Sequence, residues 1–396
     1  MDLRAVLKNF GKYVAIAFLV FALAVFAAIP LARMERPGDL LDADNSQPVV
    51  IDNVHLVTMS GDSVLTNRQL RIRRGVIEGI FTAGEPVGND YRIIDGEGAY
   101  LLPGLFDMHV HVFDRKYLAL SLAYGVTSVR NMSGYPIHLR WKQELSEGQW
   151  LGSNLAIGSP VMNGKEHSNP LAHKVASDPG KAREMVREYH AQGWDFVKVY
   201  TRLSRPVYEA IADEASKLDF PVAGHVPYEV VKSDYNLAAP MMTLEHTEEI
   251  FQGPLAYAYD DDAVEAIARQ LKAMNATVTP TLMIFDHLTQ ICRDKQAFVD
   301  TLPLQYLNPL MRFVEARTSG ARWLNADDKT RDAMEKRNTY FQAITRVLHE
   351  NDVNLVLGSD AGVIFAIPGI STHDEIALLQ KAGLPNEAIL EMATIN

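Results

Sequence analysis

Apolar and polar positions alternate in two different ways along this chain of 396 residues. Between residues 48 and 102, short alternating segments are separated by Gly, Asp and Pro, which is typical of a small antiparallel β-sandwich unit. After Gly104, apolar segments alternate with longer amphipathic stretches, and this pattern indicates βαβ units with a parallel sheet. We therefore predict an α/β protein with a small β domain at 48–102 and a larger domain at 103–396.

Eight apolar segments of the larger domain are predicted to be strands. They cover residues 105–112, 126–132, 155–161, 196–200, 221–226, 241–247, 277–284 and 354–359. Eight βα units over this length fit a TIM-type (β/α)8 barrel, whose functional side chains lie at the C-terminal ends of the strands. A doubly wound sheet is the alternative, but no Gly-rich nucleotide-binding loop follows the first strand. A helical insertion at about 287–350 either covers the barrel mouth or lies in solvent.

The N-terminal part of the chain carries a long apolar segment. A basic stretch at 1–12 precedes an uncharged run at 13–32, and a polar linker at 33–47 follows. At about 1.5 Å per residue, this run can cross a hydrocarbon core about 30 Å thick. The positive residues before it predict an anchored or exported protein, with the catalytic domain on the periplasmic or extracellular side. A cleaved signal peptide is the alternative to a transmembrane anchor.

Charge and cysteine content narrow the classes of function. The net charge is −11, and the chain past its N-terminus has no basic run of the kind that binds phosphate backbones. We therefore expect no nucleic-acid partner. Cys292 is the single cysteine, so neither an internal disulfide nor a cysteine-based metal site can form. Any metal ion must be held by histidine, carboxylate or a less usual ligand.

Polar residues lie at the C-terminal ends of five predicted strands. His109 and His111 are two positions apart in the first strand, so their side chains point to the same side. Other titratable residues occupy the ends of the fourth, fifth, sixth and eighth strands: Lys198, His225, His246 and Asp360. Such groups are costly in apolar strands unless they are paired or bind a metal. Because these strand ends meet at one face of a barrel, we predict a common site there.

These residues resemble the motifs of the amidohydrolase superfamily. The segment PGLFDMHVH at 103–111 precedes the lysine, two histidines and aspartate in the order of that family. GHVP at 224–227, TPT at 279–281, GSDAG at 358–362 and ATIN at 393–396 are similar to the imidazolonepropionase-like and prolidase-like branch, which includes Xaa-Pro and Xaa-Arg dipeptidases. The resemblance covers residues 48–396. Since the family continues past the last motif, we expect either a truncated C-terminal end or a minimal sandwich.

The resemblance implies a role for each candidate ligand. His109, His111 and Asp360 would hold the more buried of two divalent ions, and His225 and His246 the more exposed one. Lys198 would bridge the two as a carbamate made with CO2. Histidine and carboxylate-like ligands suit Zn²⁺, with Mn²⁺ or Fe²⁺ as alternatives. In the implied mechanism a metal-activated water attacks a carbonyl, and Asp360 moves its proton to the leaving amine.

The substrate is less well defined by the sequence. We expect hydrolysis of an amide, with a dipeptide or N-acyl amino acid first, while cyclic amides, lactones and phosphoesters remain open. Tyr228 follows the fifth strand and is a candidate for catalysis or for substrate binding. Arg202 and His167 are further candidates for binding substrate, and Lys165 and Lys232 could contact a terminal carboxylate.

Two other classes of protein are weighed against the two-metal hydrolase. One-metal deaminases of the same superfamily do not need the lysine, and adenosine-deaminase-like members place a glutamate where this chain has Tyr228. A membrane-tethered binding protein without turnover is the second alternative. The complete set of predicted ligands favours an enzyme over such a protein. The oligomeric state cannot be predicted from these patterns.

Overall fold

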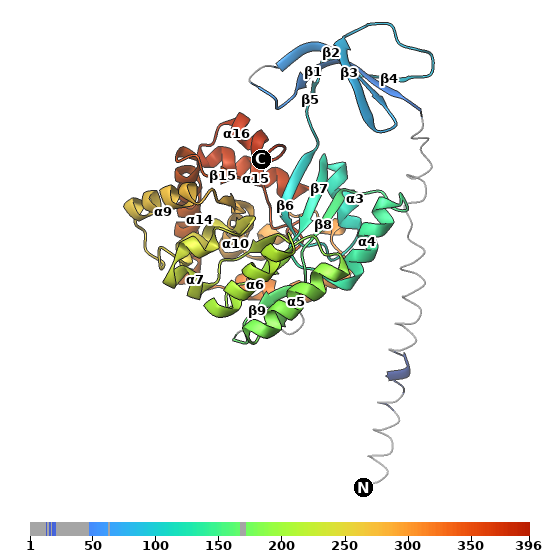
Figure 1. Cartoon of the computed structure of the whole chain (residues 1–396). Helices are drawn as coiled ribbons and strands as arrows, with labels where there is room; N and C mark the ends of the chain where they lie inside the picture. Colours follow the sequence, from blue (N-terminus) through green and yellow to red (C-terminus); the bar gives the residue numbers. More distant parts are fainter. Residues whose placement is uncertain (1–12, 14–15, 17, 21–46, 62–63, 167–171) are drawn as a thin grey trace.

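The computed structural model describes residues 13, 16, 18–20, 47–61, 64–166 and 172–396. Figure 1 shows a small sheet joined to a barrel surrounded by helices. Most of the apolar run predicted to be an anchor, 13–32, lies outside the described residues, as do the basic N-terminus and most of the linker. Within the described ranges, no helix is both long enough and apolar enough to cross a bilayer.

The small sheet contains the first five strands. They are β1 (Val49–Val57), β2 (Val64–Arg73), β3 (Val76–Thr82), β4 (Arg92–Asp95) and β5 (Tyr100–Leu101). β2 pairs antiparallel with both β1 and β3, while β4 and β5 pair parallel with β1. Its core is small: Val54, Leu56 and Leu70 form the buried apolar cluster, and Val50 and Gln69 are also buried. Most side chains of β3 and β4 remain exposed, whereas those of β1 are buried or half-buried.

The barrel is built from parallel strands in two sheets. One sheet contains β6 (Leu105–Val110), β7 (Val126–Asn131) and β8 (Asn154–Ile157). The other has the order β10-β9-β11-β12-β13-β14-β15. Its strands are β9 (Val161–Asn163), β10 (His173–Val175), β11 (Val197–Val199), β12 (Val222–Gly224), β13 (Thr243–Glu245), β14 (Thr277–Thr279) and β15 (Asn354–Leu355). Bridges from Gly158 to Phe196 and from Val110 to Ala361 join the two sheets. The prediction of a TIM-type α/β barrel is confirmed.

Helices follow most barrel strands and pack around them (Figure 1). After the first three strands come α3 (Lys116–Ala123), α4 (Pro136–Ser146) and α5 (Pro179–Gln192). The next strands are followed by α6 (Arg205–Lys217), α7 (Tyr228–Ser233), η1 (Tyr235–Ala238), α8 (Thr247–Gln252) and α9 (Asp261–Ala273), and the C-terminal helices are α15 (Ile370–Ala382) and α16 (Asn386–Met392). Asp178 and Asp260 cap α5 and α9 by accepting a backbone N–H from the first turn of the helix. Buried apolar side chains of the helices and strands form one continuous core.

The segment between β14 and β15 contains six helices joined by short loops. It contains α10 (Leu282–Asp294), α11 (Gln296–Val299), η2 (Leu304–Tyr306), α12 (Pro309–Glu315), α13 (Ser319–Leu324) and α14 (Asp328–Glu350). The predicted strand at 277–284 is wrong beyond residue 279, because α10 already begins at Leu282. Leu282, Met283 and Ile284 are buried, and a short apolar run of this kind fits a buried helix as well as a strand.

The predicted strand at 155–161 is also corrected. It divides into β8 and β9, which belong to different sheets, with Gly158, Ser159 and Pro160 between them. Pro160 has no N–H to donate to a sheet, so an uninterrupted strand through this position is disfavoured. The barrel strands are generally shorter than predicted. His109 and Lys198 lie within β6 and β11, whereas His111, His225, His246 and Asp360 lie in the segments that follow their strands.

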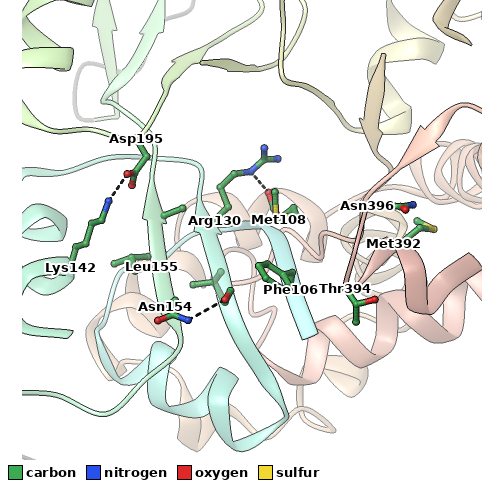
Figure 2. Close-up of a pocket in the computed structure, with 13 residues that line it drawn as sticks. Phe106, Met108, Arg130, Lys142, Asn154, Leu155, Asp195, Met392, Thr394 and Asn396 are labelled. Atoms are coloured by element: carbon green, nitrogen blue, oxygen red, sulfur yellow. Dashed lines mark hydrogen bonds and ion pairs between the residues drawn. The ribbon is translucent and has the colours of Figure 1, made fainter. Parts of the chain in front are cut away.

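A cavity of about 490 Å³ lies beside β6, β7 and β8. It is lined at these strands by Phe106, Met108, Ser128, Val129, Arg130, Asn154, Leu155 and Ala156, and elsewhere by Lys142, Asp195, Met392, Thr394 and Asn396 (Figure 2). No residue predicted to bind metal or substrate lines this cavity. The residues predicted to bind metal and substrate therefore lie away from this cavity, toward the C-terminal ends of the strands.

Candidate metal centre

Four histidines and one aspartate converge at the C-terminal ends of the barrel strands. Their imidazole rings form a row in the order His111, His109, His246, His225, which we call the histidine row. Successive ring centroids along this row lie 5.6, 4.5 and 4.6 Å apart. Asp360 Oδ1 lies 3.0 Å from His111 Nε2 and 3.5 Å from His109 Nε2. Side chains that are up to 251 positions apart in the sequence thus share one site.

Three of these residues present ligand atoms at mutual distances suited to one ion. Atoms of His109, His246 and Asp360 all lie within 4.8 Å of one another. Asp360 Oδ1 is buried and makes no hydrogen bond of good geometry; the two imidazole nitrogens are its close contacts. A buried carboxylate oxygen without a partner is costly, and a cation among these atoms would satisfy it. The predicted division of the ligands between two ions remains a prediction.

Lys198 provides a second buried atom without a partner. It lies at the centre of β11, and its Nζ makes no hydrogen bond. Burial lowers the pKa of Lys198 to about 8. The charge of Lys198 also lowers the pKa of both His109 and His225, so the amine lies within electrostatic reach of both residues. A buried amine with a lowered pKa has a neutral fraction that can react with CO2.

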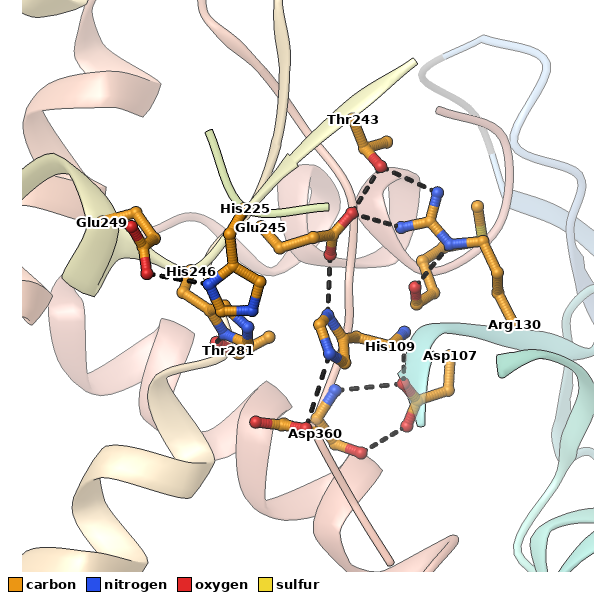
Figure 3. A network of polar contacts seen from close by, with 12 residues as sticks. Asp107, His109, Arg130, His225, Thr243, Glu245, His246, Glu249, Thr281 and Asp360 are labelled. Carbon is orange, nitrogen blue, oxygen red and sulfur yellow. Dashed lines mark hydrogen bonds and ion pairs between the residues drawn. The ribbon is translucent and has the colours of Figure 1, made fainter. Parts of the chain in front are cut away.

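The Nδ1 atoms of three histidines are held by partners outside the row (Figure 3). His109 Nδ1 lies 2.7 Å from a Glu245 oxygen, and His225 Nδ1 lies 2.8 Å from a Glu249 oxygen. His246 Nδ1 pairs with Thr281 Oγ1 at 2.6 Å. Histidines that bind metals are commonly oriented in this way through the nitrogen that does not coordinate. The arrangement leaves the Nε2 atoms as the candidate ligand atoms.

Glu245 connects the histidine row to a buried arginine. Arg130 donates from Nη2 to Glu245 Oε1 at 2.8 Å and from Nη1 to Thr243 Oγ1 at 2.8 Å. Burial alone would raise the pKa of Glu245, but the charges of Arg130 and Lys198 outweigh it and lower the pKa. An ionised Glu245 accepts a hydrogen bond from the Nδ1–H of His109, which fixes the tautomer of this ring. Arg130 also lines the cavity of Figure 2.

Asp107 joins the first barrel strand to the last. It accepts hydrogen bonds from Ser359 Oγ at 2.6 Å and from Thr372 Oγ1 at 2.7 Å. It also accepts the backbone N–H groups of His109 and Ser359. The predicted ligands His109 and Asp360 are thereby held against each other, because Asp360 directly follows Ser359 and His109 is two positions after Asp107.

The protonation states of the site suit metal binding. Burial lowers the pKa of His109, His225 and His246 well below the ordinary histidine value, which keeps these rings neutral. For Asp360, burial favours the neutral form, but the neighbouring His109 and His111 prevail and lower the pKa. Neutral imidazole and ionised carboxylate are the forms that coordinate cations.

The backbone is strained at several residues of the site. His246, Thr281 and Asp360 have φ values of 68°, 51° and 56°, in a region that non-glycine residues seldom occupy. Such conformations persist where the surrounding structure enforces them, often at functional sites. Gly224, just before His225, has φ of 139°, and a Cβ there would lie 2.2 Å from Val199 O. Only glycine allows β12 to approach β11 this closely.

Comparison with known proteins identifies the family. The pattern described as "Amidohydrolase family" matches residues 100–396, which is most of the chain. The chain belongs to the amidohydrolase family. The resemblance predicted from the motifs is therefore confirmed.

Solved structures with the same fold support this assignment. A bottromycin amidohydrolase is 26% identical, with a TM-score of 0.72 over 91% of this chain and 80% of that one. An Xaa-Pro dipeptidase is 16% identical, with a TM-score of 0.65 over 88% of this chain and 87% of the other. A prolidase from Bifidobacterium longum is 21% identical, with a TM-score of 0.62 over 87% and 81% of the two chains. The last two likenesses concern the fold.

Curated relatives match this amidohydrolase over shorter segments. Urease subunit alpha 2 of Streptomyces coelicolor is 28% identical over 142 residues, which are 32% of this chain and 25% of the urease subunit. Adenine deaminase 3 of Rhizobium johnstonii is 26% identical over 107 residues, 27% of this chain and 18% of the deaminase. The matched part is thus a quarter or less of either relative.

The predicted substrate contacts of this amidohydrolase are only partly described. Tyr228 begins α7 and donates its hydroxyl proton to Gln252 Oε1 at 3.1 Å. The guanidinium of Arg202 lies 5.1 Å from the centre of the Tyr228 ring, so these two predicted residues are neighbours. Lys165 and Lys232 are exposed. His167 lies outside the described residues, so its proposed contact with substrate stays a prediction.

Sequence reasoning missed the residues that orient the ligands. Glu245 directly precedes His246, but its contact with His109 joins positions 136 residues apart, which no local pattern reveals. Glu249 lies one helical turn after His246 and gives no signal distinct from a solvated helix. Tyr200 could have been found, because it directly follows β11 and is two positions after Lys198. Its ring centroid lies 4.2 Å from that of His225.

Proposed function

We propose that the protein is a metal-dependent hydrolase that cleaves a C–N bond of amide type, with dipeptides or N-acyl amino acids as substrates. One observation carries the proposal: a buried carboxylate oxygen and a buried amine nitrogen, neither with a hydrogen bond of good geometry, lie beside a row of oriented imidazoles. The names of similar proteins support it, since they include a bottromycin amidohydrolase, an Xaa-Pro dipeptidase and a prolidase. Cyclic amides remain a further substrate class of the same proposal.

The residues present fit a centre of two divalent ions. We propose His109, His111 and Asp360 as ligands of one ion and His225 and His246 as ligands of the other, with Lys198 between them as a carbamate. Histidine nitrogens and carboxylate-type oxygens suit Zn²⁺, with Mn²⁺ or Fe²⁺ as alternatives. When bound, such ions supply Lewis-acid activation of a carbonyl and lower the pKa of water.

The chain's own residues supply positioning and proton transfer. We propose that Asp360, ionised because His109 and His111 lower its pKa, accepts the proton of the attacking water and delivers it to the leaving amine. Glu245 and Glu249 hold the rings of His109 and His225 by the hydrogen bonds already described. Tyr228 and Arg202 are proposed to bind the substrate carboxylate, one by its hydroxyl and one by its guanidinium.

The location of the enzyme is part of the proposal. The uncharged run at 13–32 with basic residues before it supports a membrane-anchored or exported protein, with the barrel on the periplasmic or extracellular side. Digestion of the barrel by protease added to cells tests this placement. The extent of digestion is compared between intact cells with an opened outer envelope and lysed cells. Protection of the barrel in intact cells with an opened outer envelope would place it in the cytoplasm and contradict the proposal.

The proposed chemistry is tested by metal analysis combined with a panel of dipeptides, N-acyl amino acids and cyclic amides. We expect about two ions per chain and hydrolysis of at least one amide class. A chelator should abolish the activity, and adding the divalent metal again should restore it. His225→Asn should lower both metal content and activity. His190→Asn, an exposed histidine on α5, is the matched control and should change neither. Full activity in metal-free protein would overturn the proposal.

A further inference from the structure

Tyr200 directly follows β11 and lies against the His225 end of the histidine row. Its ring centroid is 4.2 Å from that of His225 and 4.9 Å from that of His173 on β10. Side chains two positions apart in an extended segment point to the same side, which places the Tyr200 side chain on the side of Lys198. Tyr200 therefore borders the candidate ligands where the barrel mouth begins.

The segments that follow β11 and β12 remain paired at the mouth of the barrel. The N–H of His225 donates to Val199 O at 3.2 Å. Further along, the N–H of Tyr228 donates to Thr201 O at 3.0 Å. Tyr200 lies between these two acceptors in the chain. Its side chain therefore leaves the backbone between the proposed metal ligands and the proposed contacts of the substrate carboxylate.

The hydroxyl of Tyr200 is available as a donor. Among the residues that the structure describes, none exchanges a hydrogen bond with it, whereas Tyr228 donates its hydroxyl proton to Gln252 Oε1. Burial raises the pKa of Tyr200, and the carboxylates of Glu249 and Asp360 add to the rise. The hydroxyl thus keeps its proton, and it lies within electrostatic reach of the candidate ligand Asp360.

The proposed reaction needs a hydrogen-bond donor at the substrate carbonyl. When water attacks an amide, negative charge develops on the carbonyl oxygen, and a donor already in place stabilises that charge. The Nδ1 atoms of three site histidines are committed to Glu245, Glu249 and Thr281. Their Nε2 atoms are the candidate metal-binding atoms. These rings therefore have no proton to offer the substrate, whereas the hydroxyl of Tyr200 has one.

We infer that Tyr200 is a catalytic residue whose hydroxyl donates a hydrogen bond to the carbonyl oxygen of the scissile amide. The inference rests on the proposed amide hydrolysis and assigns a further residue to it. The hydroxyl keeps its proton throughout, and the hydrogen bond becomes stronger as the oxygen gains charge. Because the gain arises mainly in the transition state, the hydroxyl contributes more to kcat than to substrate binding.

Tyr200→Phe tests the inference in the full-length, metal-loaded protein, because it removes the hydroxyl and keeps the ring against His225. With the best amide of the panel, kcat should fall about 100-fold, while KM changes by no more than about twofold. Metal content and the midpoint of thermal unfolding should equal those of the wild type. Tyr189→Phe, at a buried tyrosine of α5, is the matched control and should keep the wild-type kcat.

Two results with the Tyr200→Phe enzyme would overturn the inference. An unchanged kcat would show that Tyr200 only packs its ring against His225. A loss of bound metal would show that the hydroxyl supports the metal centre and does not act on the substrate. In both cases hydrolysis by the wild type would leave the proposed function in place.

Binding of a phosphonate gives a second readout that needs no turnover. N-methylphosphonate-L-proline carries tetrahedral, charged oxygens where an attacked amide would have them, and calorimetric titration measures its affinity for the metal-loaded protein. We expect Kd to be at least about tenfold higher in Tyr200→Phe than in the wild type and in Tyr189→Phe. If this difference is found but the wild type cleaves no amide, the hydroxyl remains a donor to such oxygens and the proposed function fails. Equal affinities, or no binding to the wild type, would overturn the inference.

Discussion

The small sheet and the mouth of the barrel differ in which side chains they bury. In the small sheet, apolar side chains such as Ile77 and Ile93 are exposed, and three residues form the core. At the barrel mouth, the titratable side chains of Lys198 and Glu245 are buried, and that of Asp360 is 13% exposed. Polar groups are buried at considerable cost only where a network or a ligand compensates them. The contrast shows that the site, and not the small sheet, is where substitutions should have large effects.

The largest expected effect is on activity, from Asp360→Asn. Removing the carboxylate charge takes away a proposed metal ligand and the proposed proton acceptor, and we expect kcat/KM to fall by about 10³-fold or more. Metal content and hydrolysis of the best substrate from the panel measure the effect. Ile77→Ser in the small sheet should retain both. An Asp360→Asn enzyme as active as the wild type would exclude the assigned role.

Glu245→Gln should produce the largest loss of stability. It leaves the buried guanidinium of Arg130 without its ionised partner, and breaking a buried ion pair in this way costs about 3–5 kcal/mol. Urea unfolding of the metal-free protein measures the change. The matched control is Glu78→Gln, which removes an exposed partner of Arg73 in the small sheet and should leave the midpoint nearly unchanged. Equal midpoints for the two variants would show that the Glu245 pair is not a major support.

A smaller loss is expected from Gly224→Ala. The added Cβ would meet Val199 O, and φ of 139° is unfavourable for alanine, so we expect about 2–4 kcal/mol. Gly75, in the β2–β3 turn, has φ of 75°, but a Cβ added there would meet no other atom. Gly75→Ala should therefore lower the free energy of unfolding by about 1 kcal/mol. Unfolding curves of the two variants give the comparison. A larger loss at Gly75 would contradict the difference in packing between the two regions.

The smallest effect is a pH dependence of stability from His138. Burial lowers the pKa of this histidine to about 4, below its ordinary value of 6.5. The folded state then binds fewer protons than the unfolded state, so stability is complete above pH 6.5 and falls as the pH drops toward 4. The loss is roughly 3 kcal/mol at most. Between pH 7.5 and 4.5, the unfolding midpoint should fall less steeply in His138→Gln than in the wild type. Parallel curves for the two proteins would show that His138 is not the source of the pH dependence.

Sequence patterns predicted the barrel because apolar strands with polar ends recur in it. His109 and His111 could be paired from their spacing, and the other candidate ligands from their positions at strand ends. The bounds of strands were less predictable: Leu282 to Ile284 are buried in a helix, where apolar character has no period that separates helix from strand. The contacts of Arg130 with Thr243 and Glu245 join residues more than a hundred positions apart, and only the closed barrel brings them together.

The hydrogen bonds of Asp107 with Ser359 have a consequence for how the enzyme matures. During synthesis, the predicted ligand His109 is made long before Asp360. The two side chains come together only when the last strand completes the barrel. We therefore expect the proposed centre to bind cations only after the barrel has closed.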